Sequence, residues 1–343
     1  MKIIVIGTGW YGCYISTILK NKHEVILIDK NTDIFENSSY YNQNRVHLGY
    51  HYPRSFKTRQ LCKNTYDKFL KEFSHLINKI PKNYYTISKN SLIDYDTYKN
   101  LYTYENYSFN IHQNTDFDNI DGNLIEVDEL VIDSLKAKNY FKEKLQDTKY
   151  IFNTTVNKYS RNNNKITVHT DKGDYQCDFL LDCTYNQLGL CKNNKYIYEL
   201  DIMFEFKKIN FVNFNGITIM DGNFMSLYPR DIDNDIFTLS DVEHTPVLVS
   251  DNYNDIHNYL ITNEKIDELF LKFTEKISFY YPEFKNNFTY HSYFLTKKTK
   301  IINNSASRHI IIEQVDENVV SVNCGKICGI FEFEEYLKNK ILI

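Results

Sequence analysis

Hydrophobic positions near the start of the chain predict a strand, a helix and a second strand. Lys2–Ile6 and Glu24–Ile28 are short apolar runs rich in β-branched residues, a pattern typical of buried strands. Cys13–Leu19 lies between them and is predicted to be helical. This order indicates a βαβ unit, in which two parallel strands are joined by a helix.

Apolar spacing along the rest of the chain predicts further elements. Helical periodicity predicts helices at Arg59–Asn78, Asp128–Leu145, Asn263–Ile277 and Ile327–Lys338. A pair of strands is predicted at Tyr84–Leu92. Single strands are predicted at Tyr150–Val156, Lys165–Thr170, Phe179–Cys183, His309–Glu313 and Val319–Val322, and alternating strands dominate Tyr196–Phe294.

A chain of 343 residues is long enough for two domains. We expect an α/β protein with a Rossmann-like domain, built on a parallel central sheet, from residues 1–80, 121–190 and 296–343. Residues 81–120 and 191–295 are expected to form a mostly antiparallel substrate domain.

Glycines and an acid stand where a dinucleotide-binding βαβ unit requires them. Gly7, Gly9 and Gly12 have the spacing GxGxxG directly after the first strand, and Asp29 ends the second strand. Gly7 permits the tight turn, Gly9 a close approach of the pyrophosphate, and Gly12 packing of helix on strand. Asp29 can accept hydrogen bonds from a ribose hydroxyl. The alternative is a glycine-rich turn in an ordinary α/β protein, and the flanking elements favour the dinucleotide site.

Composition excludes several classes of protein. The net charge of −4 argues against a general nucleic-acid binder, because there is no basic excess to neutralise phosphates. No apolar run is long enough for a transmembrane helix, and Met1 leads directly into the first strand without a targeting segment. The seven cysteines are scattered without a CxxC pair, which favours reduced thiols. We therefore expect a cytoplasmic protein with a small-molecule substrate, no nucleic-acid or membrane partner, and an oligomeric state left open.

In this order, the motifs resemble those of FAD-dependent oxidoreductases of the D-amino-acid oxidase type, over nearly the whole chain. The glycine motif with Asp29 matches the start of that family, and Asn153–Val156 matches the strand whose main chain contacts the adenine. Leu180–Thr184 matches the strand that ends beside the pyrophosphate. The family usually has Ala-Thr-Gly there, and this chain lacks the glycine. Gly325-Lys326 matches the C-terminal glycine turn beside the flavin.

A narrower resemblance links the chain to a poorly characterised subgroup of these flavoproteins. It rests on Asn42–Ser55, with the sequence NQNRVHLGYHYPRS, and on Asp221–Pro229, Val242–Pro246 and Ser307-Arg308. These matches are long enough to be specific for the subgroup, but they name no substrate.

The resemblance implies an FAD-dependent oxidoreductase that oxidises a C–N or C–O bond of a small polar metabolite by hydride transfer to flavin N5. It implies, together with the glycine motif, that the cofactor contacts Gly7, Gly9, Trp10, Tyr11, Gly12, Asp29, Lys30, Ser38, Asn42, Gln43, Arg45, His47, Val156, Thr184, Gly325 and Lys326. Ser39 is expected near the phosphates or the ring, beside Ser38. The candidate catalytic residues are His47, His51, His244 and Arg308. No metal is expected.

Each candidate has an alternative explanation. His47 and His51 have the spacing of a metal pair, but Gly49 and Pro53 argue against the helix that such a pair needs, so flavin or substrate contact is favoured over metal or a structural cluster. The same two histidines are the candidates if the flavin is covalently bound.

The other candidates are equally open. His244 is a general base or a loop anchor, and Arg308 binds a substrate acid or lies on the surface. Lys326 places a cation near the flavin or begins an exposed helix. Two other functions remain open: a flavin-dependent non-redox enzyme such as a sugar mutase, and a non-catalytic or NAD-binding protein.

Overall fold

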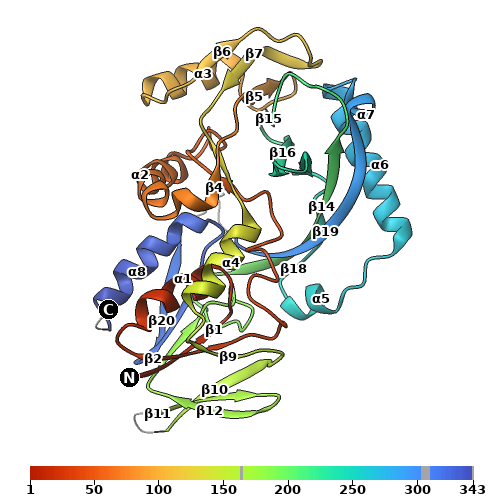
Figure 1. Ribbon diagram of the computed structural model, residues 1–343. Coiled ribbons are helices and arrows are strands. Elements are labelled where there is room, and N and C mark those ends of the chain that lie inside the picture. The colour runs from red at the N-terminus through yellow and green to blue at the C-terminus, as the bar shows by residue number, and fades with distance from the viewer. Residues whose placement is uncertain (163–164, 303–309, 342–343) are drawn as a thin grey trace. The chain divides into compact units, whose positions relative to one another are not determined.

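The computed structural model describes residues 1–162, 165–302 and 310–341 (Figure 1). The chain folds as two compact units. Unit 1 comprises residues 1–41, 134–198 and 297–343, and unit 2 comprises residues 42–133 and 199–296. Two long strands, β14 (Tyr196–Lys208) and β19 (Phe288–Ile301), include residues of both units.

Unit 1 is built on a mostly parallel sheet with the strand order β20-β21-β13-β1-β2-β9. Its strands are β1 (Lys2–Ile6), β2 (Glu24–Ile28), β9 (Lys149–Ile151), β13 (Phe179–Asp182), β20 (Ile311–Asp316) and β21 (Val319–Asn323). All neighbouring pairs are parallel except β20 with β21, which is antiparallel. The parallel central sheet and the α/β class are thus as predicted.

Helices and a small antiparallel sheet complete unit 1. The helices are α1 (Trp10–Leu19), α4 (Ser134–Lys144) and α8 (Ile330–Lys338), with the short helix η2 (Ile327–Gly329), and α1 contacts both α4 and α8. The antiparallel strands are β10 (Val156–Asn162), β11 (Lys165–Thr170) and β12 (Gly173–Cys177). Ile166 and Val168 of β11 pack against Ile4, Ile26 and Leu180 in one buried cluster. Burial on both sides explains why the central strands are continuous apolar runs.

Unit 2 contains a larger, mostly antiparallel sheet with the order β18-β14-β17-β16-β15-β5-β7-β6, to which β19 adds beside β14. The further strands are β5 (Asn83–Ser88), β6 (Asn110–His112), β7 (Ile120–Glu126), β15 (Gly216–Met220), β16 (Met225–Asp231), β17 (Ile236–Asp241) and β18 (Pro246–Ser250). Helix α6 (Asn263–Tyr280) buries Phe273 and Ile277 against Phe204 and Leu239 of this sheet.

A smaller sheet and several helices complete unit 2. Strand β8 (Leu130–Ile132) pairs with β3 (Arg45–Val46) and with β4 (Ile77–Asn78). The helices are α2 (Phe56–Phe73), α3 (Tyr95–Tyr104), α5 (Tyr253–Asn258) and α7 (Phe284–Asn287), with the short helix η1 (Ser74–Leu76).

The two compact units divide the chain differently from the expected domains at residues 42–80, 121–133, 191–198 and 296. Residues 42–80 and 121–133, expected in the Rossmann-like domain, belong to unit 2. The reason is strand pairing, because β3 and β4 both bind β8. The same pairing corrects the helix predicted at Asp128–Leu145, which begins only at Ser134. The pair of strands predicted at Tyr84–Leu92 is wrong, because this segment contains the single strand β5, which ends at Ser88.

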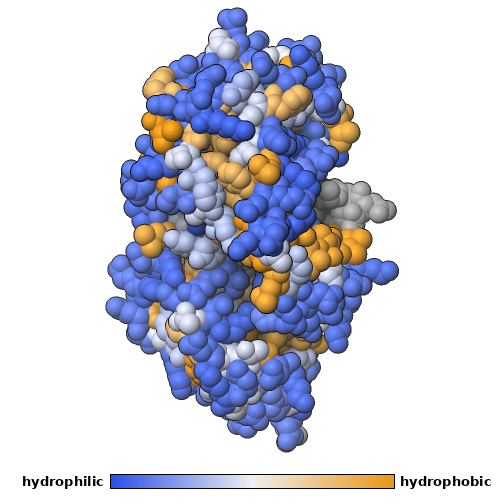
Figure 2. Space-filling view, turned by 90° about the vertical axis from the view of Figure 1, so that its right-hand side faces the viewer, coloured by the Kyte–Doolittle hydropathy of each residue, from blue (hydrophilic) through white to orange (hydrophobic). Residues whose placement is uncertain are grey.

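The described helices include none that is long and apolar enough to span a membrane. On the face drawn in Figure 2, hydrophilic side chains cover most of the surface, and apolar side chains gather in small patches.

Candidate functional site

In unit 1, the predicted cofactor residues follow the carboxyl ends of neighbouring parallel strands. Gly7 follows β1, Asp29 follows β2, Thr184 comes two residues after β13, and Gly325 comes two residues after β21. Because these strands are parallel, the four positions lie at the same edge of the sheet. In the sheet, β1 lies between β2 and β13, and the chain continues from β1 to β2 on one side while the later strand β13 pairs with β1 on the other side. Such a reversal of strand order is where open α/β sheets bind ligands.

The three glycines form a cradle that side chains would fill. Gly7 has φ +93°, and a Cβ atom there would lie 2.7 Å from the carbonyl oxygen of Cys183. A Cβ atom on Gly12 would lie 1.9 Å from the carbonyl oxygen of Gly7, and one on Gly9 would lie 2.6 Å from Oγ of Ser39. The Gly12 contact is with backbone of the turn, so helix α1 can lie this close to the turn only with glycine at that position, and the Gly7 contact likewise leaves no room for a side chain between the turn and the end of β13.

The start of helix α1 presents main chain rather than side chains to this cradle. The Trp10 amide donates a hydrogen bond to Ser39 Oγ at 3.0 Å. The Trp10 ring packs between Phe35 and Phe141, at centroid distances of 5.3 and 5.1 Å. The Ser39 hydroxyl therefore occupies a place at the helix N-terminus that suits a phosphate.

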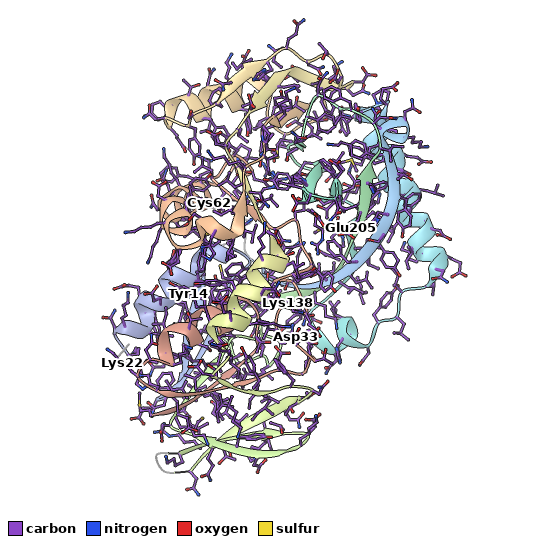
Figure 3. All side chains as sticks on the ribbon, in the orientation of Figure 1. Tyr14, Lys22, Asp33, Cys62, Lys138 and Glu205 are labelled. Atoms are coloured by element: carbon purple, nitrogen blue, oxygen red, sulfur yellow. The ribbon has the colours of Figure 1, made fainter. Side chains whose placement is uncertain are left out.

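Side chains around the cradle are held by contacts within unit 1. The Tyr11 hydroxyl donates to the carbonyl of Lys326 at 2.7 Å and so ties the C-terminal turn to helix α1. On α4, Lys138 pairs with Asp33, 3.0 Å away in the segment after β2 (both labelled in Figure 3). Val156 is buried at the start of β10. Ser38 directly precedes Ser39, the residue at the helix start.

The carboxylate of Asp29 is fully engaged by neighbouring donors. Its Oδ2 accepts from the amide and the hydroxyl of Thr8, both at 2.7 Å. Its Oδ1 accepts from the amide and the side chain of Asn31, both at 2.9 Å. Since a carboxylate has about four acceptor positions, a ribose hydroxyl would take the place of a side-chain donor of Thr8 or Asn31.

The side chain of Lys30 contacts Gln187 within unit 1. Its Nζ donates to Oε1 of Gln187 at 2.8 Å. Burial and the nearby charge of Lys297 lower the pKa of Lys30 to about 8. The charge of Asp29 acts against this lowering.

The strand end that lacks the family's glycine keeps a left-handed backbone. Tyr185 and Asn186 have φ values of +63° and +57°. The amide and hydroxyl of Thr184 donate to Oδ1 of buried Asp182, at 3.0 and 2.6 Å. Burial raises the pKa of Asp182. A Cβ atom on Gly325 would lie 3.2 Å from the Tyr185 hydroxyl, so the two strand ends are in close contact.

In unit 2, Arg45 is the centre of a buried polar network. Its guanidinium lies 3.7 Å from the centroid of the Tyr228 ring. It donates to Tyr85 at 2.7 Å, to Thr218 at 2.9 Å and to Ser226 at 2.7 Å. These contacts of NH1 and NH2 hold the guanidinium of Arg45 inside unit 2.

Glu129, a residue that no sequence pattern singled out, is the anion of this network. Its carboxylate is fully buried, 3.4 Å from Arg45 NH1, and accepts from the Tyr85 hydroxyl at 2.5 Å and the Leu48 amide at 2.9 Å. Burial alone would raise the pKa of Glu129, but His47 and Arg45 lower it to about 2. A single glutamate before the apolar run of β8 carries no sequence signal for this role.

The segment 47–52 folds as a turn rather than a helix, and it brings the two predicted histidines together. Gly49 has φ +124°, and a Cβ atom there would lie 2.7 Å from the Tyr107 hydroxyl. The rings of His47 and His51 lie 5.2 Å apart, and each lies 5.4 Å from the ring of Tyr52.

Asn42 and Gln43 are held by main-chain contacts of unit 2. The Asn42 carbonyl accepts from Arg230 at 3.0 Å, and the Gln43 side chain donates to the carbonyl of Ser226 at 3.3 Å. Arg230 is paired in turn with Glu205 at 2.7 Å (Glu205 is labelled in Figure 3). These two candidates lie beside the Arg45 network.

His244 is part of a separate cluster at the turn between β17 and β18. Its Nδ1 lies 2.6 Å from Asp241, and Lys276 of α6 lies 2.5 Å from Asp241 and 3.0 Å from Glu243. In the described part of the chain, Asp241, Glu243 and His244 are close enough together to hold a metal ion, but the ammonium of Lys276 already bridges the two carboxylates. These contacts favour the loop-anchor interpretation of His244. Arg308 lies outside the described residues.

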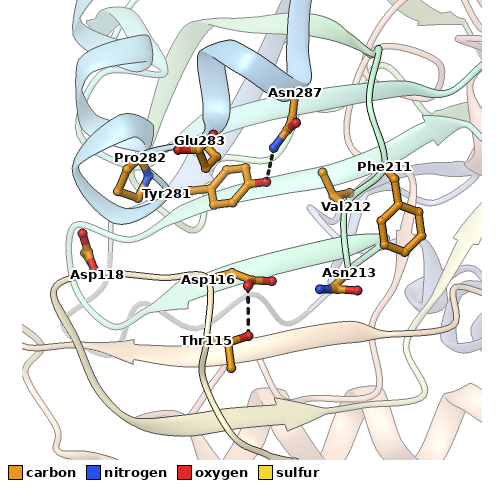
Figure 4. Close-up of a pocket in the computed structure, with 10 residues that line it drawn as sticks. All are labelled: Thr115, Asp116, Asp118, Phe211, Val212, Asn213, Tyr281, Pro282, Glu283 and Asn287. Carbon is orange, nitrogen blue, oxygen red and sulfur yellow. Dashed lines mark hydrogen bonds between the residues drawn. The ribbon is translucent and has the colours of Figure 1, made fainter.

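A cavity of about 410 Å³ lies elsewhere in unit 2 (Figure 4). Thr115, Asp116, Phe211, Tyr281 and Glu283 are among its lining residues. Its lining includes none of the site residues predicted from the sequence, as far as the described residues show, so it is not the candidate site.

Comparison with solved structures identifies the fold. Glycine oxidase from Geobacillus kaustophilus has a TM-score of 0.75 at 7% identity and covers 99% of this chain and 95% of its own. L-α-glycerophosphate oxidase from Mycoplasma pneumoniae, solved with FAD bound, has a TM-score of 0.75 at 13% identity and covers 98% and 94%. The chain therefore has the fold of FAD-dependent oxidoreductases of the D-amino-acid oxidase type, and the resemblance inferred from its motifs is confirmed.

Comparison with curated sequences adds two more similar proteins. FAD-dependent monooxygenase FPY4 of Fusarium mangiferae is 27% identical over 349 residues, covering 98% of this chain and 90% of that protein. FAD-dependent monooxygenase kojA of Aspergillus flavus is 36% identical over 78 residues, or 22% of this chain and 18% of that protein. No protein-family model matches the chain.

Proposed function

We propose that the chain is an FAD-dependent oxidoreductase that oxidises a C–N or C–O bond of a small polar metabolite. The observation that carries the proposal is the glycine cradle at the start of α1, to which β1, β2, β13 and β21 all direct their carboxyl ends. The chain-long similarity to an FAD-dependent monooxygenase supports an oxidoreductase over a sugar mutase or a non-catalytic protein.

The residues of unit 1 fit an FAD dinucleotide. Gly7, Gly9 and Gly12 leave room for the pyrophosphate, and Ser39 marks the anion position at the helix start. Asp29 is placed to accept a ribose hydroxyl once a side-chain donor of Thr8 or Asn31 gives way. When bound, FAD supplies the redox chemistry by accepting a hydride at N5.

The polar cluster of unit 2 is proposed to bind and orient the substrate. His47, His51 and Tyr52 lie together in the segment 47–52, next to the buried pair Arg45–Glu129. Arg45 is assigned a structural role here, because Tyr85, Thr218 and Ser226 already accept its hydrogen bonds. The polar side chains of this cluster suit a polar small molecule, because they can form directed hydrogen bonds with it in place of the water that hydrates it in solution.

A cytoplasmic location and the lack of a nucleic-acid partner are part of the proposal. The net charge of −4 supports the second point, and seven cysteines without a CxxC pair support a reducing compartment.

The test is the visible spectrum of the purified protein before and after acid precipitation. Flavin released into the supernatant supports the proposal and justifies screening amines, amino acids, alcohols and sugars for bleaching of the flavin. Colour that stays in the pellet indicates a covalent flavin and directs attention to His47 and His51. A colourless protein that takes up no added FAD, and whose melting temperature FAD does not raise, contradicts the proposal.

A further inference from the structure

A serine, a histidine and an aspartate lie together in unit 1, outside the site predicted from the sequence. They are carried by the small antiparallel sheet of β10, β11 and β12 (Figure 1). Oγ of Ser160 lies 2.7 Å from Nε2 of His169, and Nδ1 of His169 lies 2.9 Å from Oδ1 of Asp174. Both are hydrogen-bond distances, and they link a hydroxyl, an imidazole and a carboxylate in the order that serine hydrolases use.

The alternation of side chains along the three strands places this cluster on the outer face of the sheet. Tyr159, Val168 and Tyr175 pack into the buried core of unit 1. The residues that follow Tyr159 and Val168, and the one that precedes Tyr175, are the three members of the cluster, so all three point outward.

The strand register brings the three side chains into contact. Asp174 stands directly opposite His169, and Ser160 stands opposite Thr167, one diagonal step from His169 on the same face. The hairpin turn between β11 and β12 fixes the position of Asp174. Within that turn, the Thr170 hydroxyl donates to the carbonyl of the residue before Asp174 at 2.7 Å.

The carboxylate of Asp174 determines which nitrogen of His169 carries the proton. An ionised carboxylate only accepts hydrogen bonds, so Nδ1 donates to Asp174, and Nε2 of the neutral imidazole is then an acceptor. The Ser160 hydroxyl therefore donates to Nε2. In this arrangement the imidazole can take the serine proton as the oxygen attacks, which is how a general base activates a hydroxyl.

The cluster is open to solvent. Ser160 is exposed, and the side chains of His169 and Asp174 are 27% and 56% exposed. Lys158 stands opposite His169 on the same face, so its positive charge is close to where a carbonyl oxygen would become negative. Because water screens these charges, they stabilise a transition state less than in a buried site, and the substrate needs a good leaving group.

We propose that Ser160, His169 and Asp174 form a second reactive site, which cleaves activated esters through an acyl-serine. The Ser160 oxygen bonds to the carbonyl carbon while its proton passes to Nε2 of His169. The ester C–O bond then breaks, and the proton leaves with the alcohol or phenol. Water hydrolyses the acyl-serine in the same way, with His169 again as the base. No electron transfer takes part, so this activity is independent of the proposed flavin chemistry.

The experiment is labelling of the purified protein with an alkyl fluorophosphonate, which forms a bond from the serine oxygen to phosphorus with loss of fluoride. Mass spectrometry of the peptides then locates the label, which we expect on Ser160. His169→Gln should slow the labelling by about a hundredfold, within the range of about 10²–10⁴ that a general base contributes. Asp174→Asn should slow it by about tenfold or more, because the amide no longer fixes the tautomer of His169.

Two controls separate activation from mere exposure. The Ser250 hydroxyl is hydrogen-bonded to a carboxylate, Asp255, at 2.6 Å rather than to an imidazole, and it should stay unlabelled. Thr167→Ala changes the residue opposite Ser160 on the same face and should leave the labelling rate unchanged. The melting temperatures of the variants should stay close to that of the wild type, because these side chains lie on the outer face.

Cleavage of p-nitrophenyl acetate measures the reaction itself. We expect an acetyl group on Ser160 during the reaction, and a rate that Ser160→Ala lowers by about tenfold or more. The proposal is overturned if Ser160 is labelled no faster than Ser250, if His169→Gln is labelled at the wild-type rate, or if Ser160→Ala cleaves the ester as fast as the wild type.

Discussion

Replacing Gly12 with alanine tests whether the glycine cradle holds the cofactor. The new Cβ atom would lie 1.9 Å from the carbonyl oxygen of Gly7 and 3.1 Å from its carbonyl carbon. Carbon and oxygen atoms ordinarily approach to about 3.3–3.6 Å, so helix α1 would have to move away from the turn by more than about 1 Å. Both clashing atoms are backbone, which cannot rotate aside as a side chain can.

The size of the effect follows from two opposing contributions. Alanine gains about 1 kcal/mol over glycine in a helix interior, whereas overpacking of this kind typically costs about 1–3 kcal/mol and occasionally more. The movement also shifts the helix N-terminus from the pyrophosphate position. We expect at least a tenfold loss of FAD affinity, which corresponds to about 1.4 kcal/mol.

The assay is FAD binding by quenching of flavin fluorescence, with the melting temperature as a second measure. Gly9→Ala is the graded comparison, because its Cβ meets the Ser39 hydroxyl at 2.6 Å, a side chain that can be removed. We expect a smaller loss in Gly9→Ala and recovery in the double variant with Ser39→Ala. Gly189→Ala is the control for backbone strain without crowding: Gly189 has φ +63°, but its Cβ would meet nothing within 4 Å, so FAD affinity should stay unchanged even if the melting temperature falls. Wild-type FAD affinity in Gly12→Ala would refute the cradle.

Three further predictions concern the contacts around the two candidate regions. Arg45→Lys should lower the free energy of unfolding, measured in urea, by roughly 3 kcal/mol. An ammonium cannot replace the guanidinium contacts to Tyr85, Thr218 and Ser226 beside a buried carboxylate. A smaller loss than in Arg54→Lys, whose side chain is 56% exposed, would contradict this. Folding lowers the pKa of Glu129 from 4.5 to about 2, so the ionised carboxylate adds stability above pH 4.5 that is lost as the pH falls toward 2. The difference between the urea midpoints at pH 6 and pH 3 should therefore be smaller in Glu129→Gln than in the wild type. Tyr11→Phe should cost about 1 kcal/mol and weaken FAD binding, because the hydrogen bond to the Lys326 carbonyl is lost; an unchanged melting temperature would argue against that tie.

The candidate dinucleotide site of unit 1 is predicted from local patterns. The strand, the glycine spacing and Asp29 all lie within the first βαβ unit, where neighbours in sequence are neighbours in space. Thr184 and Gly325 joined the predicted cofactor-binding residues only through the resemblance to a known family. The structure places both positions at the same sheet edge as the glycine motif.

The unit boundaries and the environment of the histidines depended on long-range pairing. The sequence determined that His47 and His51 stand four residues apart, next to Arg45 in a polar segment. Only the fold brings Glu129, 84 residues from Arg45, into that segment, through the pairing of β3 with β8. No sequence periodicity encodes such a contact, because the register between two short strands is selected by the packing of the whole unit. A buried carboxylate beside one imidazole and a phenol beside the other are therefore properties that only the tertiary structure decided.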